Sequence, residues 1–199
     1  ELFNTPFKNG NSYASCFENG GIGIRSNYPY FDEEKEQVVT LEQDINECRK
    51  KNGEKPLSYY KGGPMADISA YMAYTSRGNI INVEIPNNDK AIDAYEMGRK
   101  LYFTKVGQLN FSCADCHVYQ TGSKLRADIP SPGIGHPTHF PAYRSSAGRL
   151  VTLHERFAGC LNRVRAKPFK AQNAEYRNLE YFMTFMSNGL EINGPGSRK

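Results

Sequence analysis

The sequence predicts a mainly helical protein made of two small domains. Three observations predict this class. Five segments show the apolar repeat of about 3.6 residues that is typical of amphipathic helices. The turn Pro86-Asn87-Asn88 separates residues 1–88 from residues 89–199. Each part contains a cysteine-bearing segment together with helices, so each is expected to form a helical domain of ordinary small size.

The first part contains two of the predicted helices. One covers residues 40–51, where Thr40 and Gln43 fit a capping box at the start of the apolar repeat. The other covers residues 64–75, with Pro64 in the first turn, a position that proline favours. Together they provide the apolar faces of a small helical domain.

The second part contains three more helical segments around a long loop. A helix is predicted over residues 89–106, and Gly98 within it is expected to allow close contact with another helix. A loop rich in glycine and proline covers residues 121–143. Apolar residues then recur at helical spacing over 150–164 and over 173–188. This order of helix, loop and helix fits a small cytochrome.

One motif in the second part predicts a cofactor. Cys113-Ala-Asp-Cys116-His117 reads C-x-x-C-H, the pattern on which haem is attached through two thioethers and ligated by the adjacent histidine. A thioredoxin-like redox motif would instead follow a strand in a βαβ unit. A zinc site would need further ligands at short spacing, and the sequence has no second C-x-x-C. The sequence therefore predicts one covalently bound haem c.

Composition and charge limit the partners and the compartment. The net charge of +4 is mild and accompanies no nucleic-acid-binding motif, so nucleic acid is not an expected partner. No apolar run approaches the roughly 20 residues that span a bilayer. Because covalent haem implies an extracytoplasmic compartment, we expect an exported periplasmic protein whose signal peptide is absent from this sequence.

The remaining three cysteines have different expected roles. Cys16 and Cys48 could form a disulfide in an oxidising compartment, or they could be two separate buried thiols. Arg156 lies four residues before Cys160, so their side chains share one face of the predicted helix. A guanidinium beside a thiol favours the thiolate and can hold a sulfur oxyanion through two hydrogen bonds. Cys160 is therefore either a functional thiol or an inert one.

A haem bound by His117 leaves a second axial position on the iron. The candidate ligands are two methionines, three histidines and one cysteine: Met183, Met186, His136, His139, His154 and Cys160. The methionines lie in the apolar face of the last helix, which is typical of core packing. His136 and His139 lie in the long loop, and His154 lies in an apolar helical face. The pattern alone leaves these candidates open.

The sequence around these residues resembles a known family. The matching segments include Gly-Gln-Leu-Asn-Phe-Ser-Cys-Ala-Asp-Cys-His at 107–117, Phe-Pro-Ala-Tyr-Arg at 140–144 and Leu-His-Glu-Arg-Phe at 153–157. In these segments the chain resembles SoxA, the larger subunit of the SoxAX cytochromes of bacterial thiosulfate oxidation. The resemblance implies two cytochrome-c-like domains. Because residues 1–88 contain no C-x-x-C-H, the first domain is expected to lack haem, with Cys16 and Cys48 bridged by a disulfide in its place.

The resemblance also implies an activity and roles for individual residues. His117 and Cys160 match the haem ligands of the family, Cys160 matches its active-site cysteine, and Arg156 matches the adjacent arginine. The implied enzyme is an L-cysteine S-thiosulfotransferase that joins thiosulfate to a cysteine of the carrier protein SoxYZ, and the implied partner is the small cytochrome SoxX. The loop over 121–143 is the expected docking surface for SoxX. Two alternatives are a plain electron-transfer cytochrome with methionine ligation and a thiosulfate dehydrogenase that forms tetrathionate.

Overall fold

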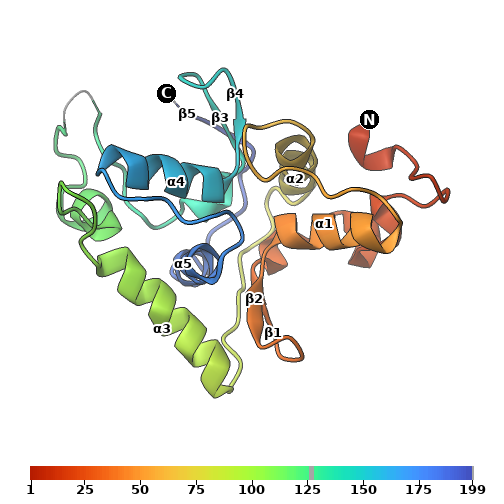
Figure 1. Cartoon of the computed structure of the whole chain (residues 1–199), viewed down its shortest axis with the longest axis horizontal. Coiled ribbons are helices and arrows are strands. Elements are labelled where there is room, and N and C mark those ends of the chain that lie inside the picture. The colour runs from red at the N-terminus through yellow and green to blue at the C-terminus, as the bar shows by residue number, and fades with distance from the viewer. Residues whose placement is uncertain (126–127, 199) are drawn as a thin grey trace.

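The computed structural model describes residues 1–125 and 128–198, and within these ranges the protein is mainly helical, as predicted (Figure 1). The helices are α1 (Leu41–Lys51), α2 (Pro64–Thr75), α3 (Asp89–Phe103), α4 (Leu153–Arg163) and α5 (Ala174–Phe185). The strands are β1 (Tyr30–Asp32), β2 (Gln37–Val39), β3 (Ala142–Arg144), β4 (Arg149–Val151) and β5 (Gly196–Arg198). None of the described helices combines the length and the apolar composition that crossing a membrane requires.

The first two helices follow their sequence signals closely. The N–H of Gln43 donates to the hydroxyl oxygen of Thr40 at 3.2 Å, which caps the start of α1. Helix α2 begins at Pro64 and ends at Thr75, as predicted. Local signals therefore predict where both helices begin and end.

The later helices are shorter than the apolar repeat predicted. Helix α3 ends at Phe103, because the next residues turn so that Val106 can pair with Phe111 through two backbone hydrogen bonds. Helix α4 begins only at Leu153, because Leu150 belongs to β4. Helix α5 ends at Phe185 and continues as a turn, rather than running on through residue 188. The apolar repeat therefore continues beyond the helices into a turn or a strand.

Two small sheets were not predicted. Strands β1 and β2 form an antiparallel hairpin. The second sheet has the order β4-β3-β5, with β3 antiparallel to β4 and parallel to β5. The predicted end of the loop over 121–143 is therefore wrong by two residues, because β3 already begins at Ala142. Strands of three residues are too short to give a recognisable alternating pattern.

Apolar side chains gather in three clusters. One surrounds α1 and α2 and includes Leu41 and Met72. A second lies between α3, α4 and α5 and includes Phe157 and Phe182. The third joins β1 and β2 to α3 and α5, and it mixes residues from both sides of the turn at Asn88. The second cluster is the one that borders the C-x-x-C-H motif, since Cys113 packs against it.

Helices α3 and α5 cross at very close range. A Cβ atom added to Gly98 would lie 2.0 Å from the carbonyl oxygen of Asn178, so only glycine fits at this crossing. The predicted close contact at Gly98 is confirmed. One turn further along α3, Tyr102 is fully buried and packs against Phe182 of α5.

A buried ionic network connects the N-terminal segment to α4 and α5. Arg25 Nη2 lies 3.4 Å from Glu180 Oε1, and His154 Nε2 lies 3.1 Å from Glu180 Oε2, with all three side chains buried. Burial by itself would raise the pKa of Glu180. The hydrogen bond and charge of His154, together with the charge of Arg25, outweigh burial and hold that pKa below its ordinary value.

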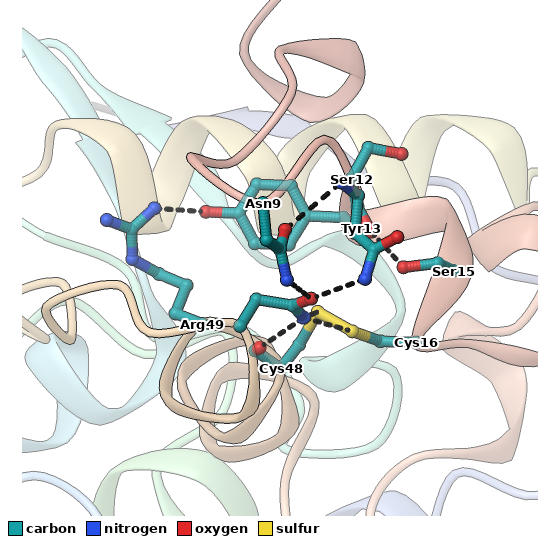
Figure 2. Close-up of a disulfide and its surroundings, with 9 residues drawn as sticks. Asn9, Ser12, Tyr13, Ser15, Cys16, Cys48 and Arg49 are labelled. Atoms are coloured by element: carbon teal, nitrogen blue, oxygen red, sulfur yellow. Dashed lines mark hydrogen bonds between the residues drawn. A yellow bond between two sulfur atoms is a disulfide. The ribbon is translucent and has the colours of Figure 1, made fainter.

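A disulfide fastens the N-terminal segment to α1. Cys16 and Cys48 are bonded, with their Cα atoms 5.7 Å apart, as the sequence analysis expected (Figure 2). Next to the bridge, Arg49 donates from Nη1 to the Tyr13 hydroxyl at 2.8 Å. The side-chain amide of Asn52 donates to the Cys48 carbonyl at 2.8 Å. The bridge and these bonds hold a segment that contains only short 3₁₀ turns before β1.

Candidate haem and thiol site

The C-x-x-C-H motif lies in a capped turn that follows α3 and the paired residues Val106 and Phe111. The N–H of Ser112 donates to Asp115 Oδ2 at 2.8 Å, and the N–H of Asp115 donates to the Ser112 hydroxyl at 3.0 Å. The backbone hydrogen bond from Ser112 is the main reason that the pKa of Asp115 is lowered. Residues Asp115–Tyr119 then form one turn of π-helix. Cys116 and His117 belong to this turn, and Cys113, two residues before it, packs against the second apolar cluster.

The ring of His117 is oriented by a backbone carbonyl. Its Nδ1 lies 2.8 Å from the carbonyl oxygen of Ser131, and the N–H of Gly133 donates back to the His117 carbonyl at 3.0 Å. A carbonyl can only accept, so Nδ1 carries the proton and Nε2 keeps the lone pair that a metal needs. Burial, together with the charge of Arg156, lowers the pKa of His117. The imidazole is therefore held in its neutral, ligating form.

Cys160 extends from α4 toward the same site. Burial is the first cause of the raised pKa of Cys113, which reaches about 12, and the negative charge of a Cys160 thiolate is the second. The same two causes, in the same order, raise the pKa of Cys116. Cys160 is therefore close enough to both motif thiols for its charge to act on them. All three thiols are partly buried, and none of them forms a disulfide.

The residues around the motif fit a haem group. Burial raises the pKa of Tyr102 and of Tyr176, and within the described ranges neither buried hydroxyl has a hydrogen-bond partner. Such unpartnered hydroxyls can donate to an acidic group that shares their pocket. Cys113 and Cys116 supply two thiols, and His117 supplies a nitrogen ligand. This donor set is the one that covalent haem attachment requires.

Three of the other candidate ligands, Met183, Met186 and His154, make contacts within the fold. Met183 is buried in the second apolar cluster and Met186 packs against it, which agrees with their expected role in core packing. His154 Nδ1 accepts the N–H of Gln172 at 3.2 Å, while its Nε2 faces Glu180. The remaining two histidines belong to the long loop.

The loop histidines lie beside His117 but are held by other groups. The ring of His136 packs edge-on against that of His117, with centroids 4.6 Å apart, and its Nε2 lies 2.9 Å from the Ser131 hydroxyl. His139 is buried, and its Nδ1 lies 3.2 Å from the Gly135 carbonyl. Cys160 differs from these candidates in that its charge acts on both motif thiols.

Sequence reasoning missed three parts of the site: Ser131, Gly133 and Tyr102. Ser131 acts through its backbone carbonyl, which no side-chain pattern can indicate. Gly133 lies against Tyr102, since an added Cβ would be 2.0 Å from the Tyr102 hydroxyl oxygen. The only sequence signal for either loop residue is the run of prolines and glycines around them.

The fold and the site define the class of this protein as a c-type cytochrome. A protein-family model described as "SoxA/TsdA, cytochrome c domain" matches residues 1–81 and 97–192. A chain in the crystal structure of SoxXA from P. pantotrophus superimposes with a TM-score of 0.88 at 32% sequence identity, covering 100% of this chain and 75% of that chain. The cytochrome c domain implies haem c as the cofactor.

Named relatives identify the family within this class. The L-cysteine S-thiosulfotransferase subunit SoxA of Allochromatium vinosum is 55% identical over 199 residues, which cover 100% of this chain and 70% of that protein. The subunit of the same name from Chlorobaculum tepidum is 56% identical over 198 residues, covering 100% of this chain and 68% of that protein. The chain belongs to the SoxA family of L-cysteine S-thiosulfotransferase subunits.

Proposed function

We propose that this chain conjugates thiosulfate to a cysteine of a carrier protein and passes the electrons on through haem c. The carrier thiol and the sulfane sulfur of thiosulfate become bonded. The carrier thiol loses its proton, and two electrons leave the two sulfur atoms. The product is a cysteine S-thiosulfonate on the carrier, so charge and atoms balance. The observation that carries this proposal is the proximity of Cys160 to the C-x-x-C-H thiols.

Cys160 is the proposed reacting thiol and, together with His117, would hold the haem iron. Its thiolate forms a bond to the sulfane sulfur of thiosulfate with the loss of two electrons, which gives an S-thiosulfonate on Cys160. The carrier thiolate then attacks the sulfane sulfur, takes the whole thiosulfonate group and releases Cys160 as a thiolate. Arg156 precedes Cys160 by one helical turn on α4 and holds the anionic substrate. Its charge also reaches His117, which supports a position beside the haem. Bound haem would supply a one-electron acceptor next to the reacting sulfur.

We further propose a single haem, bound by residues 89–199 through Cys113, Cys116 and His117. Residues 1–88 are then a cytochrome-c-like domain without haem. The Cys16–Cys48 disulfide supports this division, because it stabilises the part of the chain that contains no C-x-x-C-H. A disulfide also suits a periplasmic protein, since disulfides persist in oxidising compartments.

The proposed partners are a small SoxX-type cytochrome, which accepts electrons, and a SoxYZ-type carrier, which accepts thiosulfate. The proposed SoxX surface is the loop over 121–143, of which residues 126 and 127 lie outside the described part of the chain. Three large apolar side chains are exposed in this loop: Ile129, Ile134 and Tyr143. Exposed apolar side chains that cluster in one loop suit a protein interface.

Mass spectrometry of a reconstituted reaction tests this function. The holoprotein, in complex with its small cytochrome, is incubated with thiosulfate, a carrier protein and an electron acceptor. We expect the carrier to gain one thiosulfate unit, and we expect a carrier with its reactive cysteine replaced by serine to gain none. Tetrathionate formation with an unmodified carrier would contradict the proposal. Mass measurement of the intact chain should find one haem and one disulfide.

A further inference from the structure

The β4-β3-β5 sheet places three arginines side by side. Its register pairs Arg144 on β3 with Arg149 on β4 and with Arg198 on β5. Side chains of directly paired residues project from the same face of a sheet, and like charges in such positions repel each other. The three cations therefore destabilise the sheet unless negative charge compensates them.

This face of the sheet is directed at α4, the helix that contains Cys160. Ala142 shares a strand face with Arg144 and packs in the same apolar cluster as Phe157 of α4. Arg149 reaches the first turn of α4, where its guanidinium binds both carboxylate oxygens of Glu155 at 2.9 and 2.5 Å. Arg144 is adjacent to Arg149 on the same face, so its side chain also extends toward α4.

The charges that act on Arg144 agree with its position on the sheet face beside α4. Burial is the first cause of its lowered pKa, and the positive charges of Arg156 and Arg163 follow, while the negative charges of a Cys160 thiolate and of Asp128 oppose them. Arg144 on β3 and Arg156 on α4 therefore lie close enough for their charges to act on each other. The Arg144 side chain is only partly exposed, which strengthens its interaction with an anion relative to a fully solvated one.

Within the described residues, Arg149 and Arg163 pair with carboxylates, whereas Arg144, Arg156 and Arg198 form no such pair. Glu155 balances Arg149, and Asp128 lies 3.8 Å from Arg163. In the described part of the chain, neither Arg144 nor Arg156 forms an ion pair. Two partly buried guanidiniums, one on β3 and one on the helix that contains Cys160, therefore keep their hydrogen-bonding capacity unused in the described structure, as the donors of an oxyanion site would.

We propose that Arg144 is a second thiosulfate-binding residue, holding the sulfonate oxygens together with Arg156 so that the sulfane sulfur faces Cys160. This inference rests on the proposed function. Thiosulfate has two negative charges and three sulfonate oxygens, and an oxygen can accept more than one hydrogen bond, so two guanidinium forks can bind the sulfonate together by sharing one oxygen. The planar fork of arginine suits such oxygens better than the single ammonium of lysine.

Thiosulfate binding to three variants tests this role. Arg144→Met, Arg144→Lys and the control Arg99→Met are prepared as holoprotein in complex with the small cytochrome. Arg99 is an exposed arginine on α3 that pairs with Glu96. Arg99→Met therefore removes one positive charge, as Arg144→Met does, but at a position away from β3 (Figure 1). The dissociation constant for thiosulfate is measured by calorimetry without carrier or acceptor, so that no turnover occurs. The KM values for thiosulfate and for carrier are then measured separately.

For Arg144→Met we expect the dissociation constant and the KM for thiosulfate to rise roughly ten- to a hundredfold, the loss expected for a hydrogen bond between charged groups. Arg144→Lys should lie between this variant and the wild type, and Arg99→Met should match the wild type. The KM for the carrier should stay within about twofold, the change expected of a surface charge outside its interface. If the Arg144→Met protein does not accumulate in folded form, the dissociation constant of Arg144→Lys is compared with that of the wild type instead.

Three results would overturn the proposal. The first is an unchanged dissociation constant for thiosulfate in both Arg144 variants. The second is a rise in the KM for carrier alone, which would assign Arg144 to an acidic surface of the carrier. The third is a shifted haem potential with unchanged thiosulfate binding, which would assign it to a haem propionate. A wild-type complex that binds thiosulfate but forms no conjugate would contradict the proposed function and leave the binding test of Arg144 valid.

Discussion

The carbonyl oxygen of Ser131 lies 2.8 Å from His117 Nδ1, and this contact determines which ring nitrogen is available to a metal. A histidine ligand whose second nitrogen donates to a carbonyl is fixed in both tautomer and orientation. The loop that supplies this carbonyl is itself held in place, because the N–H of Gly133 donates to the His117 carbonyl. The motif and the loop therefore position each other, although 14 residues separate His117 from Ser131.

The first prediction concerns the fit of Gly133 against Tyr102. An added Cβ at Gly133 would lie 2.0 Å from the Tyr102 hydroxyl oxygen and 3.2 Å from Cζ. Gly133→Ala should therefore lower the free energy of unfolding by about 1–3 kcal/mol through overpacking. Adding Tyr102→Phe removes the clashing oxygen and should restore most of the loss. Urea unfolding of the two single variants and the double variant measures this coupling, and simply additive losses would contradict the contact.

The second prediction concerns the disulfide. Cys16 and Cys48 are 32 residues apart in the sequence, and bridging a loop of this length should stabilise the fold by about 3–4 kcal/mol. The double variant Cys16→Ala/Cys48→Ala should lose about that much stability in urea unfolding. A mild reductant should destabilise the wild type and leave the double variant unchanged. Equal unfolding midpoints for the two proteins without reductant would show that the bridge contributes nothing.

The third prediction concerns the buried pair of Arg25 and Glu180. Arg25→Met would leave the Glu180 carboxylate buried without this compensating charge. We expect a loss of about 3–5 kcal/mol in the free energy of unfolding, typical of breaking a buried ion pair. The control is Lys50→Met, which breaks an exposed pair with Glu47 and should cost at most about 1 kcal/mol. Similar losses in the two variants would rule out a special role for the buried pair.

The fourth prediction is a pH dependence that arises from His139. Burial, followed by the charge of Arg198, lowers its pKa to about 4, against about 6.5 in an unfolded chain. The unfolded chain then binds a proton that the folded chain does not. Stability from this residue is therefore complete above about pH 6.5 and is lost as the pH falls toward 4.

Between about pH 7 and pH 5 this loss should reach about 1–2 kcal/mol. His139→Gln should be less stable at pH 7 in absolute terms but should show a flatter fall with pH. Urea unfolding at three pH values in this interval measures both slopes. Identical slopes in the wild type and the variant would mean that His139 does not titrate as its burial indicates.

Some elements could be predicted because their signals are local. Thr40 caps the start of α1 through its side chain, and Pro64 is the first residue of α2, where its ring suits the first turn. Both starts could therefore be predicted from single residues. Gly98 was predicted as a contact point because a glycine inside a helical repeat needs a packing reason. Likewise, C-x-x-C-H is a local motif, so the position of the haem-binding residues needed no tertiary information.

Other features depend on contacts between distant segments and left no local signal. The strand β5 pairs with β3 across more than 50 residues, so the row of arginines at Arg144 cannot be seen in the sequence. A backbone carbonyl has the same chemistry in every residue type, so the sequence gives no sign of its role. Only the fold of the loop directs the carbonyl of Ser131 at His117. Cys160 could be ranked as a functional thiol from Arg156, but its proximity to Cys113 required the packing of α4 against the motif.

Cys160 has two proposed roles, second iron ligand and reacting thiol, and an optical redox titration of Cys160→Met distinguishes a ligand from a bystander. Haem attachment should persist, because Cys113, Cys116 and His117 remain. A neutral thioether stabilises ferric iron less than a thiolate does, so we predict a changed ferric spectrum and a markedly higher midpoint potential. A Cys160→Met protein with the ferric spectrum and the potential of the wild type would show that Cys160 does not bind the iron.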